Sequence, residues 1–216
     1  MEIKMMRLEE LLGYKFSNIS LLELALRHRS VGSENNERLE FLGDSVLSFI
    51  VSRKLFLEGL KDDEATLTRK RSVLTDRTTL RKVAERLGLK ELVMVGDSLQ
   101  GRTSQKMLAD VVEAIIGAVY LDGGVEGAER VISKILFEGD LAAEALERQD
   151  WISMVKEWSD QQRVQYRYVT FEEDAEDGKY FQAWLTVGDL TETGTGGTKK
   201  EAMASAAKKM MAKLSP

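Results

Sequence analysis

The spacing of apolar residues changes near residue 150, and this change divides the 216-residue chain into two parts. Before it, apolar residues recur three and four positions apart, as in helices that bury one face, at 8–12, 21–26, 39–57, 67–87 and 107–121. After it come a helix at 151–158, alternating segments at 164–171 and 180–187, a short run at 190–194 and a helix at 198–214. The sequence therefore predicts an all-α domain over 1–146 and a small α+β domain, αβββα, over 150–216, with a short connection between them.

Composition excludes several classes of protein. The chain has no cysteine, so disulfides, thiolate metal sites and thiol nucleophiles are ruled out. Its apolar stretches are too short to span a membrane, and charged residues interrupt residues 1–12, unlike the apolar segment of a signal peptide. We therefore expect a cytoplasmic protein with no membrane partner.

The net charge of −5 argues weakly against a nucleic-acid partner, because phosphate binding usually requires a basic face. The local distribution of charge differs from what this net charge suggests. Between Arg53 and Arg86 there are ten Lys or Arg residues and six Asp or Glu residues. A basic surface can thus coexist with an acidic total, although solvated helix faces alone would explain the same run.

Acidic residues gather on one face of the helix predicted at 39–57 and the turn before it. Glu37, Glu40 and Asp44 are spaced i, i+3 and i+7, which places them together at about 100° per residue. The opposite side is apolar and consists of Leu39, Leu42, Val46, Phe49 and Ile50. The pattern predicts an amphipathic helix whose carboxylates share one side.

A second helix repeats this arrangement. Asp110 and Glu113 stand at i and i+3, and the apolar face consists of Leu108, Val112, Ile115, Ile116 and Val119. Ala114 and Gly117 lie beside the acids, where small side chains would let another backbone approach closely. Contact between the two helices would bring their carboxylates to one point, although acids that merely face solvent would explain either helix alone.

Carboxylates held close together repel one another and shift toward the neutral form unless a divalent cation supplies the missing charge. Hard oxygen ligands suit Mg²⁺, with Mn²⁺ able to substitute. Such an ion can generate a nucleophile from water and stabilise the leaving oxygen of a phosphodiester displacement. A two-histidine acid–base pair or a histidine-rich zinc site needs more than one histidine. The chain has only His28, which we interpret as structural.

The stretch from Asn36 to Leu47, NERLEFLGDSVL, resembles the signature of the ribonuclease III family. ALRHRS at 25–30 is similar to an upstream family segment, with an arginine where threonine is common. LAD at 108–110, Glu113 and YLDGG at 120–124 are similar to the downstream one. The resemblance covers nearly the whole chain and implies an endoribonuclease that cuts double-stranded RNA, by analogy in ribosomal and messenger RNA precursors.

The resemblance assigns roles to the acids. It implies four metal-binding carboxylates, Glu40, Asp44, Asp110 and Glu113. Activity would depend most on Asp44 and Glu113, while Glu37 and Glu64 would contact RNA or support the metal cluster. Next to Glu64, Ala65 replaces a usual glycine. The expected products carry a 5′-phosphate and a 3′-hydroxyl, and no organic cofactor is expected.

Members of this family act as homodimers joined through the catalytic domain, with two sites that cut opposite strands and leave short 3′ overhangs. Phe41 falls on the acid-bearing side of its helix and is not needed for the apolar face. Phe41 is therefore a candidate for the dimer contact. Ordinary packing within one subunit would explain its position equally well.

The carboxyl-terminal part resembles a double-stranded RNA-binding domain, a module that reads the shape of A-form RNA. The segment GTGGTKKEA at 194–202 presents Thr198, Lys199 and Lys200 at a helix start, where free amides and the helix dipole also favour phosphate. In the first helix, Glu157 is a candidate contact to a ribose hydroxyl. The last helix should pack on the sheet through Met203, Ala206, Ala207, Met210 and Leu214.

The tail also departs from the family pattern. Such domains commonly carry a Gly-Pro-x-His loop between the first two strands, whereas this chain has Asp174, Ala175, Glu176 and Asp177. Acidic residues there should repel phosphate. Lys156 stands where glutamine is frequent, and residues 151–216 contain nine basic and ten acidic side chains. We expect RNA binding by the tail to be weak or strongly dependent on salt.

Two other classes of protein share some of these features. A catalytically silent family member would bind structured RNA without cutting it, but all six expected acids are present. A helical dimetal carboxylate protein with redox chemistry normally uses Glu-x-x-His pairs, and the chain has one histidine. The sequence therefore favours the nuclease.

Overall fold

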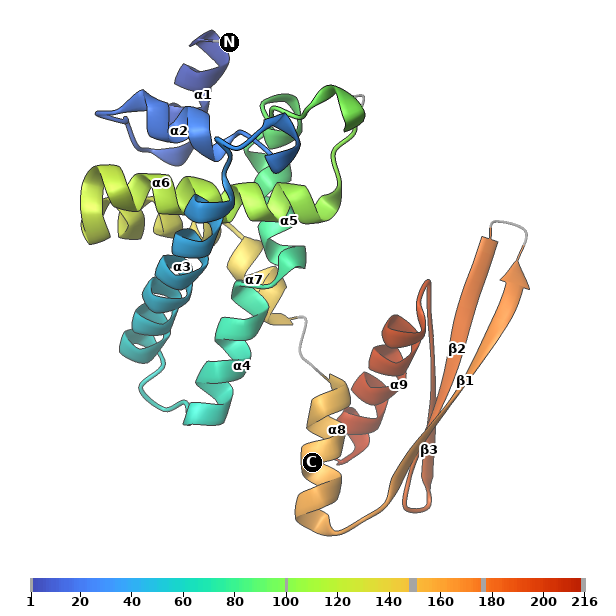
Figure 1. Cartoon of the computed structure of the whole chain (residues 1–216). Helices are drawn as coiled ribbons and strands as arrows, with labels where there is room; N and C mark the ends of the chain where they lie inside the picture. The colour runs from blue at the N-terminus through green and yellow to red at the C-terminus, as the bar shows by residue number, and fades with distance from the viewer. Residues whose placement is uncertain (1, 100, 148–150, 176–177, 215–216) are drawn as a thin grey trace. The chain divides into compact units, whose positions relative to one another are not determined.

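The computed structural model describes residues 2–99, 101–147, 151–175 and 178–214. The chain forms two compact units, Met1–Arg148 and Gln149–Pro216, which we name the helical unit and the α+β unit (Figure 1). The predicted fold class, an all-α domain followed by an αβββα domain, is confirmed. Within the described residues, no helix combines the length and the apolar character needed to cross a bilayer.

The helical unit contains α1 (Glu2–Leu12), α2 (Ile19–Ala25), α3 (Glu37–Glu58), α4 (Glu64–Leu74), α5 (Arg77–Arg86), α6 (Gln105–Ile132) and α7 (Leu141–Glu147). Short helical turns occur at Arg29–Val31, Leu89–Glu91, Asp97–Leu99 and Ser133–Phe137. The segment 67–87, predicted as one helical stretch, is divided between α4 and α5. Asp76 causes the division, because its side chain accepts a hydrogen bond from Thr79 N at 2.7 Å and caps the start of α5.

The core of the helical unit lies around α3 and α6, which contact each other more extensively than any other pair of elements. The apolar face predicted for α6 is buried throughout, and in α3 the side chains of Leu39, Val46 and Ile50 are buried as expected. Phe49 is an exception, since 56% of its surface is exposed. It lies about 100° around the helix from Ile50, at the border of the apolar face, and nothing in the described part of the subunit covers it.

The α+β unit contains α8 (Trp151–Gln162), β1 (Tyr166–Ala175), β2 (Gly178–Val187), β3 (Leu190–Gly196) and α9 (Lys199–Leu214). The strands form an antiparallel sheet in the order β1-β2-β3. The ladder between β1 and β2 runs from Tyr166 opposite Val187 to Ala175 opposite Gly178. Asp174 and Ala175, expected in a loop between the first two strands, are instead the last residues of β1, where they pair with Lys179 and Gly178. Glu176 and Asp177 of that expected loop lie outside the described residues.

The core of the α+β unit is formed by one face of the sheet and the two helices. Val155 of α8 and Leu185 of β2 are fully buried together with three residues of α9, Ala206, Ala207 and Met210. Met203 and Leu214 pack against this cluster and are partly buried. The predicted contact of the last helix with the sheet is confirmed.

Candidate active site

The start of α3 is held in place by Asn36, which is 3% exposed. Its backbone N–H donates to Arg27 O at 2.9 Å, and its side-chain Nδ2 donates to Ala25 O at 3.2 Å. Its own carbonyl accepts from Glu40 N at 2.9 Å and so begins the helix. A buried amide with satisfied donors fixes where α3 begins, and therefore the direction in which the acids of its first turns point.

Two glycines let α3 and α6 approach at backbone distance. A Cβ on Gly43 would overlap the carbonyl oxygen of Glu113 and would lie 2.9 Å from Gly117 N. A Cβ on Gly117 would overlap the carbonyl oxygen of Leu39 and would lie 3.2 Å from Gly43 N. Of the two small residues predicted beside the acids of α6, Ala114 and Gly117, Gly117 lies at the contact between the helices. This contact brings the acid-bearing faces of the two helices together.

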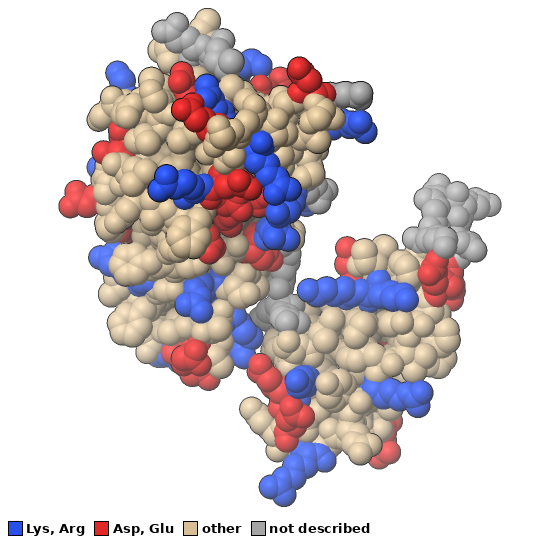
Figure 2. All heavy atoms as spheres, viewed as in Figure 1, with Lys and Arg blue, Asp and Glu red and all other residues tan. Residues whose placement is uncertain are grey.

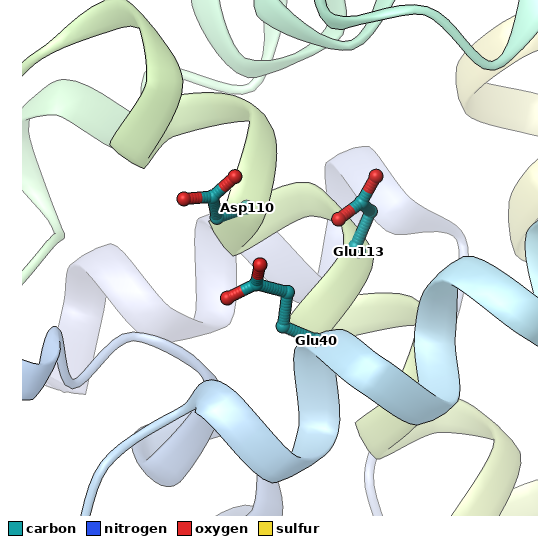
Figure 3. A group of neighbouring side chains, drawn as sticks. All are labelled: Glu40, Asp110 and Glu113. Carbon is teal, nitrogen blue, oxygen red and sulfur yellow. The ribbon is translucent and has the colours of Figure 1, made fainter.

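Three carboxylates converge at this crossing. Glu40 comes from α3, whereas Asp110 and Glu113 come from α6, and one oxygen of each lies within 4.8 Å of the others. Figure 3 shows the three side chains close together, Glu40 on one helix and Asp110 and Glu113 on the other. All three side chains are partly buried, so the group remains open to solvent. Such an all-oxygen donor set fits a hard divalent cation.

The three carboxylates line a hollow of about 440 Å³ in the surface of the helical unit. Glu37, Asp44, Phe41 and Arg77 complete its lining. The predicted common face of Glu37, Glu40 and Asp44 is therefore confirmed as a geometric arrangement. In Figure 2, acidic side chains gather on the visible face of the helical unit with Lys and Arg side chains on both sides of them.

Among the acids of this hollow, Glu113 has the pKa that departs most clearly from its ordinary value. Burial, followed by the charges of Asp44, Asp110 and Glu40, raises the pKa of Glu113 from 4.5 to about 8. Burial and the charge of Asp110 also raise the pKa of Glu40. At neutral pH and without a cation, Glu113 is therefore mostly protonated. A bound divalent cation would favour the charged form, which is the condition expected of metal ligands.

A second hollow, of about 580 Å³, adjoins the first and shares Glu37, Glu40 and Asp110 with it. Two cations on its lining pair with these acids. Arg29 Nη1 lies 3.5 Å from Glu37 Oε1, and Lys106 Nζ lies 3.8 Å from Asp110 Oδ2. The sequence interpretation did not include Lys106 or Arg77. The i, i+4 spacing of Lys106 and Asp110 could have indicated the first, whereas the position of Arg77 depends on how α5 packs.

Glu64 is not brought into the hollow within one subunit. It is the first residue of α4, it is exposed, and its Oε1 accepts a hydrogen bond from Thr68 Oγ1 at 3.0 Å. His28 lies near the acids, but its Nδ1 contacts Ser30 Oγ at 2.9 Å and Ser30 N at 3.2 Å. Burial and the charge of Arg29 lower the pKa of His28. The ring therefore acts as a cap for the turn at Arg29–Val31.

The candidate RNA contacts of the α+β unit lie at the start of α9 and on α8. Thr198 Oγ1 accepts from Glu201 N at 3.2 Å and caps α9, so Lys199 and Lys200 project from its first turn and are exposed. Lys199 Nζ lies 5.9 Å from the centre of the Phe181 ring. Glu157 is exposed on α8.

Comparison with known proteins gives matches over both units. Residues 18–139 match the family model described as Ribonuclease-III-like, and residues 151–214 match the Double-stranded RNA binding motif. Ribonuclease 3 of Coxiella burnetii is 38% identical over 162 residues, which are 73% of this chain and 70% of the relative. Ribonuclease 3 of Bordetella pertussis is 47% identical over 128 residues, which are 58% of this chain and 50% of the relative.

Solved structures give the same result for the helical unit. The nuclease domain of ribonuclease III from Campylobacter jejuni aligns with a TM-score of 0.58 and 37% identity, covering 60% of this chain and 94% of that one. Together, fold and matches define a nuclease domain followed by an RNA-binding domain, a hydrolase specific for double-stranded RNA. The chain belongs to the ribonuclease III family, whose members generally use a divalent metal.

Proposed function

We propose that this endoribonuclease hydrolyses the phosphodiester bonds of duplex RNA with a divalent cation, Mg²⁺ or in its place Mn²⁺, held by Glu40, Asp110 and Glu113. Asp44, which lines the same hollow, would complete the ligand set. The observation that carries the proposal is the convergence of three carboxylates from two helices within 4.8 Å. Convergence at this distance raises the free energy of the metal-free site, and a cation removes that penalty.

The proposed reaction adds water across the bond between phosphorus and the 3′ oxygen. The hydroxyl of water joins phosphorus, the bond to the 3′ oxygen breaks, and that oxygen takes the remaining proton, leaving a 5′-phosphate and a 3′-hydroxyl. When bound, a divalent cation makes water more acidic and stabilises the leaving oxygen. The chain holds the carboxylates at fixed separation. Glu37, which also lines the hollow, would contact RNA or support the metal cluster. Glu64, on α4, would do so from outside the hollow.

We further propose the catalytic domain at 1–146 and the RNA-binding domain at 150–216, acting in the cytoplasm on ribosomal and messenger RNA precursors. Lys199 and Lys200 would contact phosphates at the start of α9, where Thr198 fixes the helix end. Glu157 on α8 would accept a hydrogen bond from a ribose hydroxyl. The exposure of these side chains supports the assignment.

A cleavage assay on a labelled, perfectly paired RNA duplex tests the metal-dependent reaction. With Mg²⁺ or Mn²⁺ we expect discrete short duplexes with 5′-phosphate ends, and with a chelator or with Ca²⁺ alone we expect intact RNA. Cleavage that persists after complete removal of divalent ions would disprove the proposed chemistry. Binding without cleavage in every ion would instead support a silent RNA-binding protein.

We also propose that two copies associate through the helical unit, with Phe41 at the contact. Phe41 is 79% exposed, so packing within one subunit does not account for it. It stands at the edge of a hollow of about 1070 Å³ whose lining includes Leu24, Leu42 and Leu121. An exposed ring beside an apolar hollow is suited to a two-fold contact, because each copy offers both halves. The similar nuclease domain from Campylobacter jejuni is described as flexible in a region involved in dimer formation, which supports the proposal.

Replacement of Phe41 by Ser should shift the protein from dimer to monomer in sedimentation velocity, because the contact loses a buried ring worth about 2 kcal/mol or more in each half. Leu60→Ser is the matched control, since Leu60 is 88% exposed and does not line the hollow. A dimer that persists unchanged in Phe41→Ser, or a wild-type protein that sediments as a monomer, would refute this contact.

A further inference from the structure

Basic side chains line both hollows at the carboxylate group. The second hollow contributes Arg29, Arg102 and Lys106, whereas the hollow that holds the three carboxylates contributes Arg77. Glu37, Glu40 and Asp110 line both hollows, so the cations and the carboxylate group belong to one stretch of surface. Cations beside a carboxylate group match a phosphate backbone that crosses the site, if the phosphate at the carboxylates is the one bound with a metal.

Arg77 differs from Arg29 and Lys106 because its guanidinium forms no ion pair within the described residues. Arg29 pairs with Glu37, and Lys106 pairs with Asp110. Arg77 is exposed and makes no ion pair with any residue in the described part of the chain, although it lines the same hollow as four carboxylates besides Glu37. Its donors are therefore free for an anion supplied from outside.

The position of Arg77 is set by the backbone. It is the first residue of α5, directly after Asp76, whose side chain caps the helix at Thr79 N. The charge of Arg77 reaches the acids, because it acts to lower the pKa of both Glu40 and Glu113. A planar guanidinium with several parallel donors suits the oxygens of a phosphodiester.

We propose that Arg77 contacts a backbone phosphate of the RNA strand next to the phosphodiester that is cleaved, and so positions that strand over the carboxylates. This assignment rests on the proposed metal-dependent cleavage. Such a contact is made equally before and during the reaction, so it should act on RNA binding and on KM more than on kcat. If Arg77 only offset the charge of the acids, its removal would change metal binding instead.

The test compares Arg77→Gln and Arg77→Lys with Arg81→Gln in the full chain. Arg81 lies one turn further along α5, pairs with Glu85 at 3.7 Å and does not line the hollow, which makes it a matched control. Duplex RNA binding is measured in Ca²⁺ over a range of salt. Cleavage is measured in Mg²⁺ over a range of RNA concentration, and the Mg²⁺ concentration for half-maximal rate is determined for each variant.

For Arg77→Gln we expect a rise of about tenfold in KM, little change in kcat, and a slope of log affinity against log salt that is smaller by about one. Arg77→Lys should keep the salt slope, because the charge remains, and Arg81→Gln should match wild type. Wild-type KM and salt slope in Arg77→Gln, with or without a lower Mg²⁺ requirement, would overturn the proposal. Failure of wild type and Arg81→Gln to cleave would count against the metal-dependent reaction, and the binding data would still decide the role of Arg77.

Discussion

Glu113→Gln should lower the rate of duplex cleavage at least about 10³-fold, equivalent to about 4 kcal/mol of lost transition-state stabilisation. Glu113 is one of three carboxylates whose oxygens lie within 4.8 Å, so the amide removes a charge from the proposed cation site. The variant should still bind duplex RNA, since the basic residues of both units remain. Single-turnover cleavage and a binding titration on the same duplex measure the two effects separately.

Glu126→Gln provides the control, because Glu126 lies on α6 beyond the kink at Gly124, is exposed and does not line the hollow. It should cleave at the wild-type rate. A Glu113→Gln protein that retains more than about a tenth of wild-type activity in Mg²⁺ would remove Glu113 from the proposed ligand set.

The same residue gives the metal-free protein a definite dependence on pH. The pKa of Glu113 is raised from 4.5 to about 8, so folding favours its protonated form. The stabilising effect is complete below the ordinary glutamate pKa and is lost as pH rises through about 8, by on the order of 2 kcal/mol after allowance for solvent screening. In chelator, urea unfolding should show this loss for wild type and not for Glu113→Gln.

Metal binding should show the opposite trend. Because the cation needs the carboxylate form, affinity for Mg²⁺ should increase with pH until about 8, and binding should release protons. Calorimetry in buffers of different ionisation enthalpy measures that release. No proton release near neutral pH would mean that Glu113 is already charged in the metal-free protein.

Much of the fold follows from local pattern. The period of three to four residues located α3 and α6, and the alternation after residue 150 located the three strands, because both patterns come from burial of one face. The acids of α3 were placed on one side by spacing alone, and all three line the same hollow. Local pattern therefore identified the elements and the face of each that carries the chemistry.

The positions of the helices relative to one another in space were harder to predict than the helices themselves. The pattern could not show that Glu64 lies apart from the carboxylate group, because its place depends on the path from α3 to α4. Nor could it place Arg77 at the hollow, since a basic residue at a helix start is common on a solvated surface. Phe49 was assigned to the core although it is 56% exposed, because periodicity does not define the border of an apolar face.

Gly43→Ala should destabilise the protein by about 3 kcal/mol and abolish most of its cleavage activity, although alanine favours a helix over glycine by about 1 kcal/mol. The sign follows from the crossing of α3 and α6. A Cβ at position 43 would overlap the carbonyl oxygen of Glu113, and backbone atoms cannot move aside as a flexible side chain can. The helices must separate, which displaces Glu40 from Asp110 and Glu113.

Urea unfolding and cleavage of the same preparation test both consequences. Ser45→Ala is the control, because Ser45 is exposed on α3 two residues further on, where alanine meets no backbone. It should leave stability and activity near wild type. If Gly43→Ala is as stable as wild type, the helices can adjust at little cost, and the close backbone contact does not set the separation of the carboxylates. If it is destabilised but the folded fraction cleaves normally, the crossing supports the fold alone.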